Sequence, residues 1–345
     1  MSNNTIKTIK LTEISAFSNQ GFTCNDVFSC VSLNIEPPSQ TDMTINIPGD
    51  ISAPQSIYCN AIKALDQALP LERVKILLES TLVPMLKTLI EKYVAKDIVV
   101  HILLPSLSSP QSDILNEKSV KGMLVRLFPG IERIKLIFTS LGTSVLKIVE
   151  QQVKAFENDL EHDVLVICGV DSLINTNNFQ TLVQKHQLRT DSNECGQSPS
   201  EAAICLCWEK TVEVVNSLVE FSQVNQSDSM QTVIDQTLQS TPVNIDSVVL
   251  IHTQTYDDVL AWHDVSQSVW NKPLTMSYTA SGVQEVKLFE VIGETGVTNA
   301  LLAIAYAAGR LDYPFYNSNG VMLIENQHLL STTCIVTKNL NIIKE

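Results

Sequence analysis

The chain has 345 residues, of which 23 are Lys or Arg and 37 are Asp or Glu, so its net charge at neutral pH is −14. Hydrophobic residues make up 44% of the chain, which is enough for a packed core and excludes global disorder. The acidic balance argues against nucleic acid and anionic membranes as partners, because both attract dense sets of Lys and Arg side chains. The length predicts one large domain or two domains of about 170 residues.

No targeting or metal-binding signal is evident. No apolar run reaches the roughly 20 residues that span a bilayer, and the polar residues 1–13 lack the apolar core of a signal peptide. We therefore expect a cytoplasmic protein. The eight cysteines include no CxxC pair, so we expect no metal site and no cofactor.

The hydrophobic pattern of the first half alternates between strands and helices. It predicts strands over 6–14, 97–104, 131–138 and 163–170, and helices over 60–68, 71–94, 117–127, 143–156 and 179–185. Pro84 lies inside the second of these helices, where it should kink the helix or mark a boundary. Residues 35–55 contain four prolines and are expected to be mostly irregular. This order of elements predicts a mainly parallel sheet with helices on both faces.

The second half repeats the same kinds of element. Strands are predicted over 202–208 and 211–219 as a hairpin, then over 247–252, 286–291, 320–325 and 333–338, with helices over 230–238, 257–270 and 295–309. The repeat indicates an internal duplication, with halves at 1–210 and 211–345 that form one compact unit. The helix over 295–309 is apolar or small nearly all round, so we expect it to lie buried between two sheets.

Two stretches of sequence carry a family resemblance. One is CGVDSLI at 168–174 with GQSPSEAAICLCW at 196–208, and the other is VIGETGVTNALLAIAYAAG at 291–309. Together they resemble the thiolase superfamily, in particular the β-ketoacyl synthases, and LTEISAFSNQGF at 11–22 resembles that family's first strand and loop. The resemblance implies an α/β fold of five layers, α-β-α-β-α, built from two similar halves. It also implies a dimer formed through the N-terminal half.

The catalytic residues of the family do not carry over. Family members hold a nucleophilic cysteine at the N-terminus of a helix, and the corresponding stretch here, 139–144, has no cysteine. The family's second-half histidine lies in a His-Gly-Thr motif, whereas His252 is followed by Thr253 and Gln254. The family has His or Asn before the central helix, whereas this chain has Glu294, which cannot polarise a carbonyl as a neutral or cationic donor does.

The other candidate residues have simple structural interpretations. Cys168 ends a buried strand and is expected to be a core residue. We expect His252 to be a hydrogen-bonded structural histidine, with a remnant catalytic base as the alternative. Glu201 matches a family glutamate and is expected to be structural, and His263 is expected to be solvated.

Hydroxyl side chains in 139–144 offer the alternative of a serine-type site. Ser140, Thr143 or Ser144 would need an adjacent general base such as His252, because a hydroxyl has no accessible anionic form near neutral pH. Capping of the following helix explains these residues more simply. The basic stretch from Lys118 to Lys135 is expected to be a solvated face, with an acidic partner such as a carrier protein as the alternative.

These observations predict no catalytic, cofactor-binding or metal-binding residue. The resulting hypothesis is a non-catalytic thiolase-fold protein that acts through protein–protein contacts as an adaptor or accessory protein. The resemblance suggests two precedents: thiolase-like accessory proteins of bacterial type VI secretion loci, in a role such as effector loading, and the inactive partner subunit of a heterodimeric ketosynthase. Low glycine content and acidic charge favour the first.

The alternatives are an acyltransferase related to the β-ketoacyl synthases and an acyl-binding protein without chemistry. We expect a homodimer or heterodimer and protein partners of unknown identity.

Overall fold

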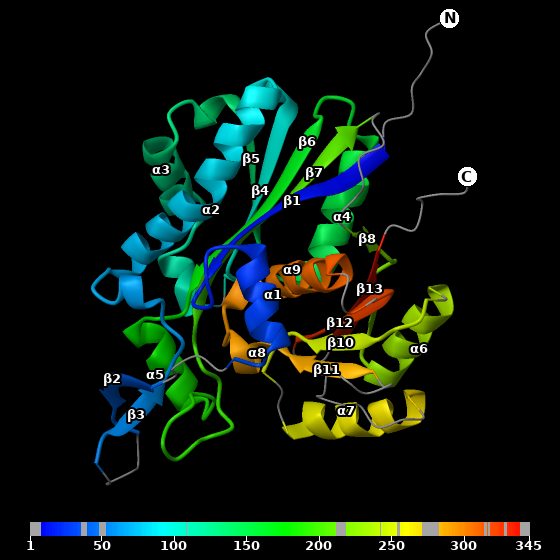
Figure 1. Ribbon diagram of the computed structural model, residues 1–345. Helices are drawn as coiled ribbons and strands as arrows, with labels where there is room; N and C mark the ends of the chain where they lie inside the picture. The colour runs from blue at the N-terminus through cyan, green and yellow to red at the C-terminus, as the bar shows by residue number, and fades with distance from the viewer. Residues whose placement is uncertain are drawn as a thin grey trace, which may run out of the picture.

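Two β-sheets form the framework of the protein (Figure 1). This computed structural model describes residues 8–35, 40–47, 53–107, 109–211, 219–241, 243–253, 256–270, 283–313, 316, 318–327 and 330–338. The strands of the first sheet come from residues 8–211 and those of the second from residues 220–337.

The first sheet has five strands in the order β1-β7-β6-β4-β5. These are β1 (Thr8–Ser18), β4 (Ile98–Leu104), β5 (Lys135–Ser140), β6 (Val164–Ser172) and β7 (Glu201–Thr211). β4 runs parallel to β5 and β6, whereas β7 runs antiparallel to β6 and β1, so the sheet is mixed and not mainly parallel. Every residue of β4 and β6 is buried, as expected for continuous apolar strands covered on both faces.

The prediction of a hairpin was wrong, and the prediction of a mostly irregular segment needs an addition. The predicted hairpin of 202–208 with 211–219 does not form, because β1 and β6 already occupy both edges of β7; residues 212–218 lie outside the described part of the chain. Residues 35–55 are not all irregular, since β2 (Gln40–Ile45) and β3 (Gln55–Tyr58) pair as an antiparallel ribbon. Pro54 immediately precedes β3, a position where a strand tolerates proline.

The second sheet has the order β11-β10-β12-β13-β8. Its strands are β8 (Glu220–Phe221), β10 (Ser247–Leu250), β11 (Gln284–Lys287), β12 (Gly320–Gln327) and β13 (Leu330–Thr337), and β9 (Asn225–Ser227) also pairs with β13. β10 is parallel to both β11 and β12. The carboxyl ends of β10 and β12 therefore lie side by side, which positions the candidate site described below.

Helices cover both sheets and fill the space between them (Figure 1). The outer layers are α2 (Pro70–Lys92) and α3 (Glu117–Leu127) on the first sheet, and α6 (Met230–Ser240) and α7 (Tyr256–Val269) on the second. The middle layer contains α4 (Val145–Asn158) and α9 (Asn299–Asp312), with α1 (Cys24–Ser32) against α9. This is the predicted α-β-α-β-α arrangement. Two short helices, α5 (Thr176–Gln184) and α8 (Leu288–Val291), complete the described helices.

Two local predictions for helices also need correction. The helix expected over 60–68 is only a short 3-10 turn at Lys63–Leu65. α2 continues through Pro84, so this proline does not mark a helix boundary. Pro84 lies on the exposed side of α2, where a helix can curve and lose one backbone hydrogen bond to water at little cost.

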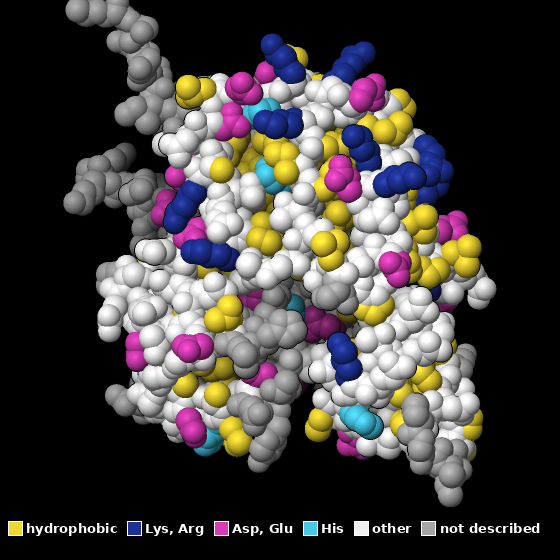
Figure 2. Space-filling view, turned by 180° about the vertical axis from the view of Figure 1, so that it is seen from behind, with side chains coloured by type: hydrophobic (Ala, Val, Ile, Leu, Met, Phe, Trp, Pro, Cys, Tyr) yellow, Lys and Arg dark blue, Asp and Glu magenta, His cyan; other side chains and the backbone are white. Residues whose placement is uncertain are grey.

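Basic side chains gather over the layers of the first sheet. Lys118, Lys121 and Arg126 are exposed on α3, and Arg133 and Lys135 are exposed just after it. Figure 2 shows most of the visible Lys and Arg side chains on the upper part of this face, over the first sheet and its helices. In the same view, acidic and histidine side chains appear in a hollow below the centre.

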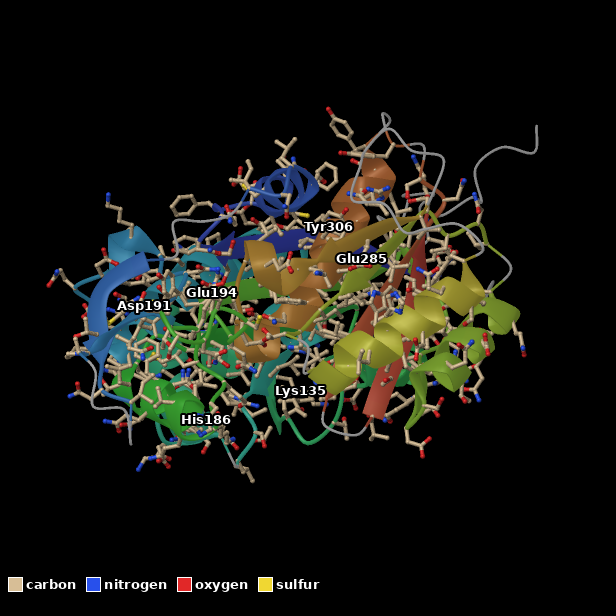
Figure 3. All side chains as sticks on the ribbon, turned by 90° about the horizontal axis from the view of Figure 1, so that it is seen from below. Lys135, His186, Asp191, Glu194, Glu285 and Tyr306 are labelled. Atoms are coloured by element: carbon tan, nitrogen blue, oxygen red, sulfur yellow. The ribbon has the colours of Figure 1, made fainter. Side chains whose placement is uncertain are left out.

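The central helix α9 is buried on all sides, as the sequence predicts. Every residue from Asn299 to Leu311 is buried. Tyr306, which is 0% exposed, lies near the middle of the molecule in Figure 3. At the end of the helix, the Arg310 guanidinium donates to Gln284 at 2.5 Å and to Asp246 at 3.2 Å. Its burial is therefore compensated by a carboxylate and an amide oxygen.

Candidate functional site

His252 lies just beyond the carboxyl end of β10, between two glutamates. Its Nδ1 is 2.8 Å from Oε1 of Glu294, and its Nε2 is 3.7 Å from Oε1 of Glu325. Burial opposes the charged ring, but the two carboxylates outweigh burial and raise the pKa of His252 to about 10. The side chain is therefore an imidazolium ion at neutral pH and cannot accept a proton as a general base.

Glu325, on β12, fills the N-terminus of α4. Its fully buried carboxylate accepts hydrogen bonds from the Val145 N–H at 2.9 Å, the Leu146 N–H at 3.0 Å and the Ser144 hydroxyl. Burial raises the pKa of Glu325, but hydrogen bonds and the charge of His252 outweigh burial and lower it. An anion at this position is stabilised by unpaired N–H groups and the positive end of the helix dipole.

Both the backbone and the side chain of Glu294 form hydrogen bonds that fix its position. The backbone exchanges hydrogen bonds of 2.8 Å with Ser198 and Ser200. The carboxylate accepts from the Asn299 amide at 2.8 Å and from the Thr253 N–H at 3.3 Å. Gly293, which precedes it, has φ +87°, and a Cβ there would lie 2.7 Å from the Ser198 carbonyl oxygen. Only glycine fits this turn, so the position of Glu294 is fixed by the backbone.

A further carboxyl group, that of Asp171 at the end of β6, lies near this site. Burial raises its pKa to about 7. Gln111 donates to it at 3.3 Å and the Val297 N–H at 3.4 Å. A Cβ on Gly296, which has φ +61°, would lie 2.2 Å from its Oδ2. Asp171 is therefore enclosed by backbone from the turn that leads into α9.

The arrangement differs from that of a condensing site. A condensing site needs a nucleophile at the helix N-terminus, a base able to accept its proton, and free N–H donors for an oxyanion. Here the donors at the start of α4 bind Glu325, and the histidine is already protonated. The Ser144 hydroxyl donates to Glu325, so its proton is directed to a carboxylate whose pKa is lowered by its hydrogen bonds and by His252.

The structure separates most of the residues considered as candidates from this site. Ser140 and Thr143 are exposed at the end of β5 and in the loop that follows. Cys168 packs in the hydrophobic cluster between the first sheet and α2, away from α4, and lies opposite Cys205 on β7. The side chain of His263 is 70% exposed.

Glu201 belongs to a separate buried network. Its carboxylate accepts from the Arg73 guanidinium at 2.6 Å, from the Ile62 N–H at 2.8 Å and from the Ser172 hydroxyl at 2.8 Å. These bonds tie α2 and the preceding loop to the first sheet. This geometry is that of a structural ion pair.

The sequence analysis did not identify Glu325 or Asn299. The available signal for Glu325 was an acidic residue directly after an apolar run, in the segment MLIE. The parallel register pairs Leu250 with Ile324, so the residues that follow them, including His252 and Glu325, reach the same edge of the sheet. That register was not predictable from the sequence alone.

Neither a metal site nor a membrane-spanning helix is evident in the described residues. No three His, Cys, Asp or Glu side chains in that part of the chain are placed to hold a metal ion. None of its helices combines the length and the apolar character needed to cross a bilayer.

The two sheets and the enclosed helices define a thiolase-like ketosynthase fold, as comparison with solved structures shows. A type II PKS acyl-carrier protein in complex with its ketosynthase matches with a TM-score of 0.66 and 9% identity, covering 96% of this chain and 99% of that chain. A ketosynthase in complex with its chain length factor from Xenorhabdus doucetiae matches with a TM-score of 0.64 and 12% identity, covering 98% and 100%. The module 6 ketosynthase of the Bacillus subtilis bacillaene synthase matches with a TM-score of 0.66 and 11% identity, covering 97% and 72%. At these identities the likeness establishes the fold alone. No model of a known protein family and no curated protein sequence matches this chain.

Proposed function

We propose that this protein is a non-catalytic member of the ketosynthase fold that acts by binding other proteins, as an adaptor or accessory protein in the cytoplasm. The observation that carries the proposal is the carboxylate of Glu325 at the N-terminus of α4. It binds the N-terminus of the helix that follows residues 139–144, the stretch where the family resemblance places the nucleophile.

Restoring a catalytic site would require Glu325 to leave its position. The carboxylate has two backbone donors, one hydroxyl donor and a neighbouring imidazolium. Removing one partner of a buried charge pair costs roughly 3–5 kcal/mol, because the other charge remains buried and unpaired. Substrate binding would have to supply this free energy before any chemistry. The cluster therefore supports a structural role, in which β10 and β12 of the second sheet are joined to α4.

Two biological settings agree with this proposal. The family resemblance, with the acidic charge, scarce glycine and absent cysteine, favours the thiolase-like accessory proteins of type VI secretion loci. The alternative is the inactive partner subunit of a heterodimeric ketosynthase, and the similar solved structures include a ketosynthase paired with its chain length factor. Affinity purification from native lysate that recovered only an acyl-carrier protein would refute the first setting.

We also propose that the protein dimerises through its N-terminal half. β5 is the last strand of the first sheet, and in the described part of the chain β4 is its only paired strand. Its residues from Leu136 to Thr139 are half-buried. An edge strand of this kind is a ready template for pairing with another chain. The halves 1–210 and 211–345 are proposed to form one compact unit, since α9 packs against strands of both sheets.

The proposed lack of catalysis is tested by intact-protein mass spectrometry. The protein is incubated with a panel of acyl-coenzyme A and acyl-carrier thioesters, beside an active ketosynthase as the positive control. We expect no change in mass and no release of free thiol, while the control becomes acylated. A single acyl adduct that maps to residues 139–144 would contradict the proposal and make the protein an acyltransferase with a hydroxyl nucleophile. In that case Ser140→Ala, Thr143→Ala and Ser144→Ala, made one at a time, would identify the acylated hydroxyl.

A further inference from the structure

A cavity of about 690 Å³ lies where the start of α2 meets the start of α5. This volume is within the roughly 300–1,000 Å³ typical of ligand sites. Apart from Met43, its lining residues come from the segments 59–73 and 174–179. None of them is a hydrogen-bonding partner of the cluster around His252 described above. We call it the α2–α5 cavity.

Arg73 brings unused hydrogen-bond donors to this cavity. Its side chain lines the cavity and is only 6% exposed. A guanidinium carries five N–H donors. Arg73 uses two, since Nε donates to the Ala68 carbonyl at 3.2 Å and Nη1 donates to Glu201 at 2.6 Å. Nη2 forms no hydrogen bond within the described part of the chain, and it is not one of the fully buried polar atoms that lack a partner there, so it reaches accessible space. An occupant of the cavity that accepts hydrogen bonds can therefore use it.

The charges that line the cavity favour an anion. Lys63 and Arg73 are positive and Asp66 is negative, so the lining has a net charge of +1 in a chain whose net charge is −14. Lys63 is exposed and forms no ion pair among the described residues. Asp66 is exposed too, so solvent and salt screen its repulsion of an anion.

Glu201 compensates part of the charge of Arg73 without lining the cavity. Its carboxylate also accepts from the Ile62 N–H and the Ser172 hydroxyl, so Arg73 is one of three donors that it has. The remaining N–H groups of a planar guanidinium match the two oxygens of a second carboxylate. A carboxylate is therefore the acceptor that this end of the cavity fits best.

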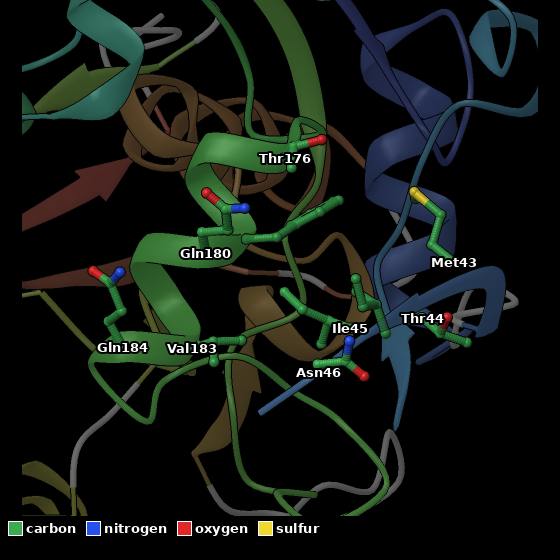
Figure 4. Close-up of a pocket in the computed structure, with 10 residues that line it drawn as sticks. Met43, Thr44, Ile45, Asn46, Thr176, Gln180, Val183 and Gln184 are labelled. Atoms are coloured by element: carbon green, nitrogen blue, oxygen red, sulfur yellow. The ribbon is translucent and has the colours of Figure 1, made fainter. Parts of the chain in front are cut away.

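The end of the cavity at α5 has the opposite character. Ile174 and Phe179 line it and belong to a hydrophobic cluster. Thr176 and Phe179 also line a second cavity of about 720 Å³, between β2 and α5 (Figure 4). None of the ten residues that line this second cavity carries a charge. An elongated occupant therefore has apolar surface and uncharged space beyond the charged end.

We propose that the α2–α5 cavity binds a small-molecule carboxylate with an elongated apolar body. The carboxylate accepts hydrogen bonds from the unused donors of Arg73, and Lys63 supplies a second positive charge. The apolar body lies against Ile174 and Phe179. This inference goes beyond the proposed function and can fail independently of it, because no part of it uses His252 or Glu325.

The test is isothermal titration calorimetry of the full chain with phenylbutyrate and with octanoate. Each is compared with its primary amide, and acetate is the carboxylate that lacks an apolar body. Gln67→Trp places a bulky ring in the cavity from an exposed position, and Ala64→Trp is its control at an exposed position that does not line the cavity. Lys63→Gln removes a lining charge, and Lys75→Gln removes an exposed charge on α2 outside the lining.

We expect one site per chain for at least one of the two carboxylates, with its amide and acetate at least tenfold weaker. Gln67→Trp should weaken binding at least tenfold and Lys63→Gln several-fold, whereas Ala64→Trp and Lys75→Gln should bind as the wild type does. Arg73→Lys keeps a cation beside Glu201 but removes the planar donors, so it should also weaken binding at least tenfold.

Three results would overturn the proposal. These are no binding of either carboxylate, equal binding of a carboxylate and its amide, and equal binding by the two tryptophan variants. If circular dichroism shows that Arg73→Lys is unfolded, Gln67→Trp and Lys63→Gln decide the question, because both positions are exposed and neither forms a buried contact with Glu201.

Discussion

At the scale of single residues, the two glutamates around His252 decide what the histidine can do. An unperturbed histidine exchanges its proton near neutral pH and is suited to general base catalysis. Here the pKa rises from 6.5 to about 10, although burial alone would lower it. The ring then acts as a fixed cation that compensates the buried charge of Glu325.

This charge state predicts how stability depends on pH. Because the folded pKa of His252 is raised, its contribution to stability is complete below pH 6.5 and is lost as pH rises to about 10. Glu325 acts in the opposite sense: its pKa is lowered, so its contribution is present above 4.5 and is lost as pH falls further. Between pH 7 and 9 we expect the free energy of unfolding in urea to fall by up to about 1.4 kcal/mol per pH unit.

Nitrogen-15 NMR of the histidine rings tests the cause directly. Both ring nitrogens of His252 should remain protonated at pH 8. The variant Glu294→Gln keeps the shape of the side chain but removes one negative charge, so it should lower the pKa of His252. A wild-type His252 ring that loses its proton near pH 6.5 would show that the two carboxylates do not raise its pKa.

The residues of the site were only partly predictable. The sequence showed that His252 and Glu294 stand where catalytic residues would lie in the resembling family, because both follow recognisable segments of the chain. It did not show that Glu325 binds the N-terminus of α4. That contact joins residues about 180 positions apart, and it depends on the distance between β12 and α4, which no local pattern encodes.

At the scale of elements, the contact between α1 and α9 depends on Gly309. A Cβ at this position would lie 2.7 Å from the Cβ of Phe28, which is fixed to the backbone of α1 and cannot rotate away. Helix propensity favours alanine over glycine by about 1 kcal/mol. Overpacking of a core costs about 1–3 kcal/mol, which should outweigh this gain in helix propensity. We therefore expect Gly309→Ala to lower the free energy of unfolding.

Gly122 in α3 is the matched control for this prediction. No heavy atom lies within 4 Å of a Cβ placed there, so Gly122→Ala should gain only the helix propensity and stabilise the protein by about 0.5–1 kcal/mol. Urea unfolding should therefore show a lower free energy of unfolding for Gly309→Ala and a higher one for Gly122→Ala. Stabilisation by Gly309→Ala would mean that α1 and α9 can move apart without loss of stability.

Prediction of elements succeeded where the periodicity was strong. The bounds of α3 agree with the prediction, and α9 is buried on all sides as its small and apolar residues indicated. Strand pairing was less predictable. The segment before β8 looked like a hairpin partner of β7, but which strands occupy the edges of β7 depends on β1, nearly 200 residues earlier in the chain.

At the scale of the whole molecule, the outer edge of β5, which pairs with no second strand among those that the structure describes, predicts a homodimer in the isolated protein. Two copies of β5 related by a twofold axis would pair antiparallel and join the two first sheets into one. Light scattering after gel filtration should then give twice the chain mass of 38.1 kDa. The half-buried Ile137 on β5 would lie against the second copy. Ile137→Lys should therefore place a charge in this interface and shift the mass to that of one chain.

The control is Val259→Lys, which also adds a lysine at an apolar residue but lies on α7, at the outer layer of the second sheet. Val259 is 47% exposed, so this variant should remain dimeric and as stable as the wild type. If Ile137→Lys unfolds instead of dissociating, circular dichroism will show it, and the more conservative Thr139→Lys on the same strand can replace it. A dimer that survives both β5 substitutions would place the interface elsewhere. A wild-type protein that is monomeric at tens of micromolar would exclude the homodimer and leave β5 as a site for a different chain, because an uncovered edge of this kind promotes association with other strands.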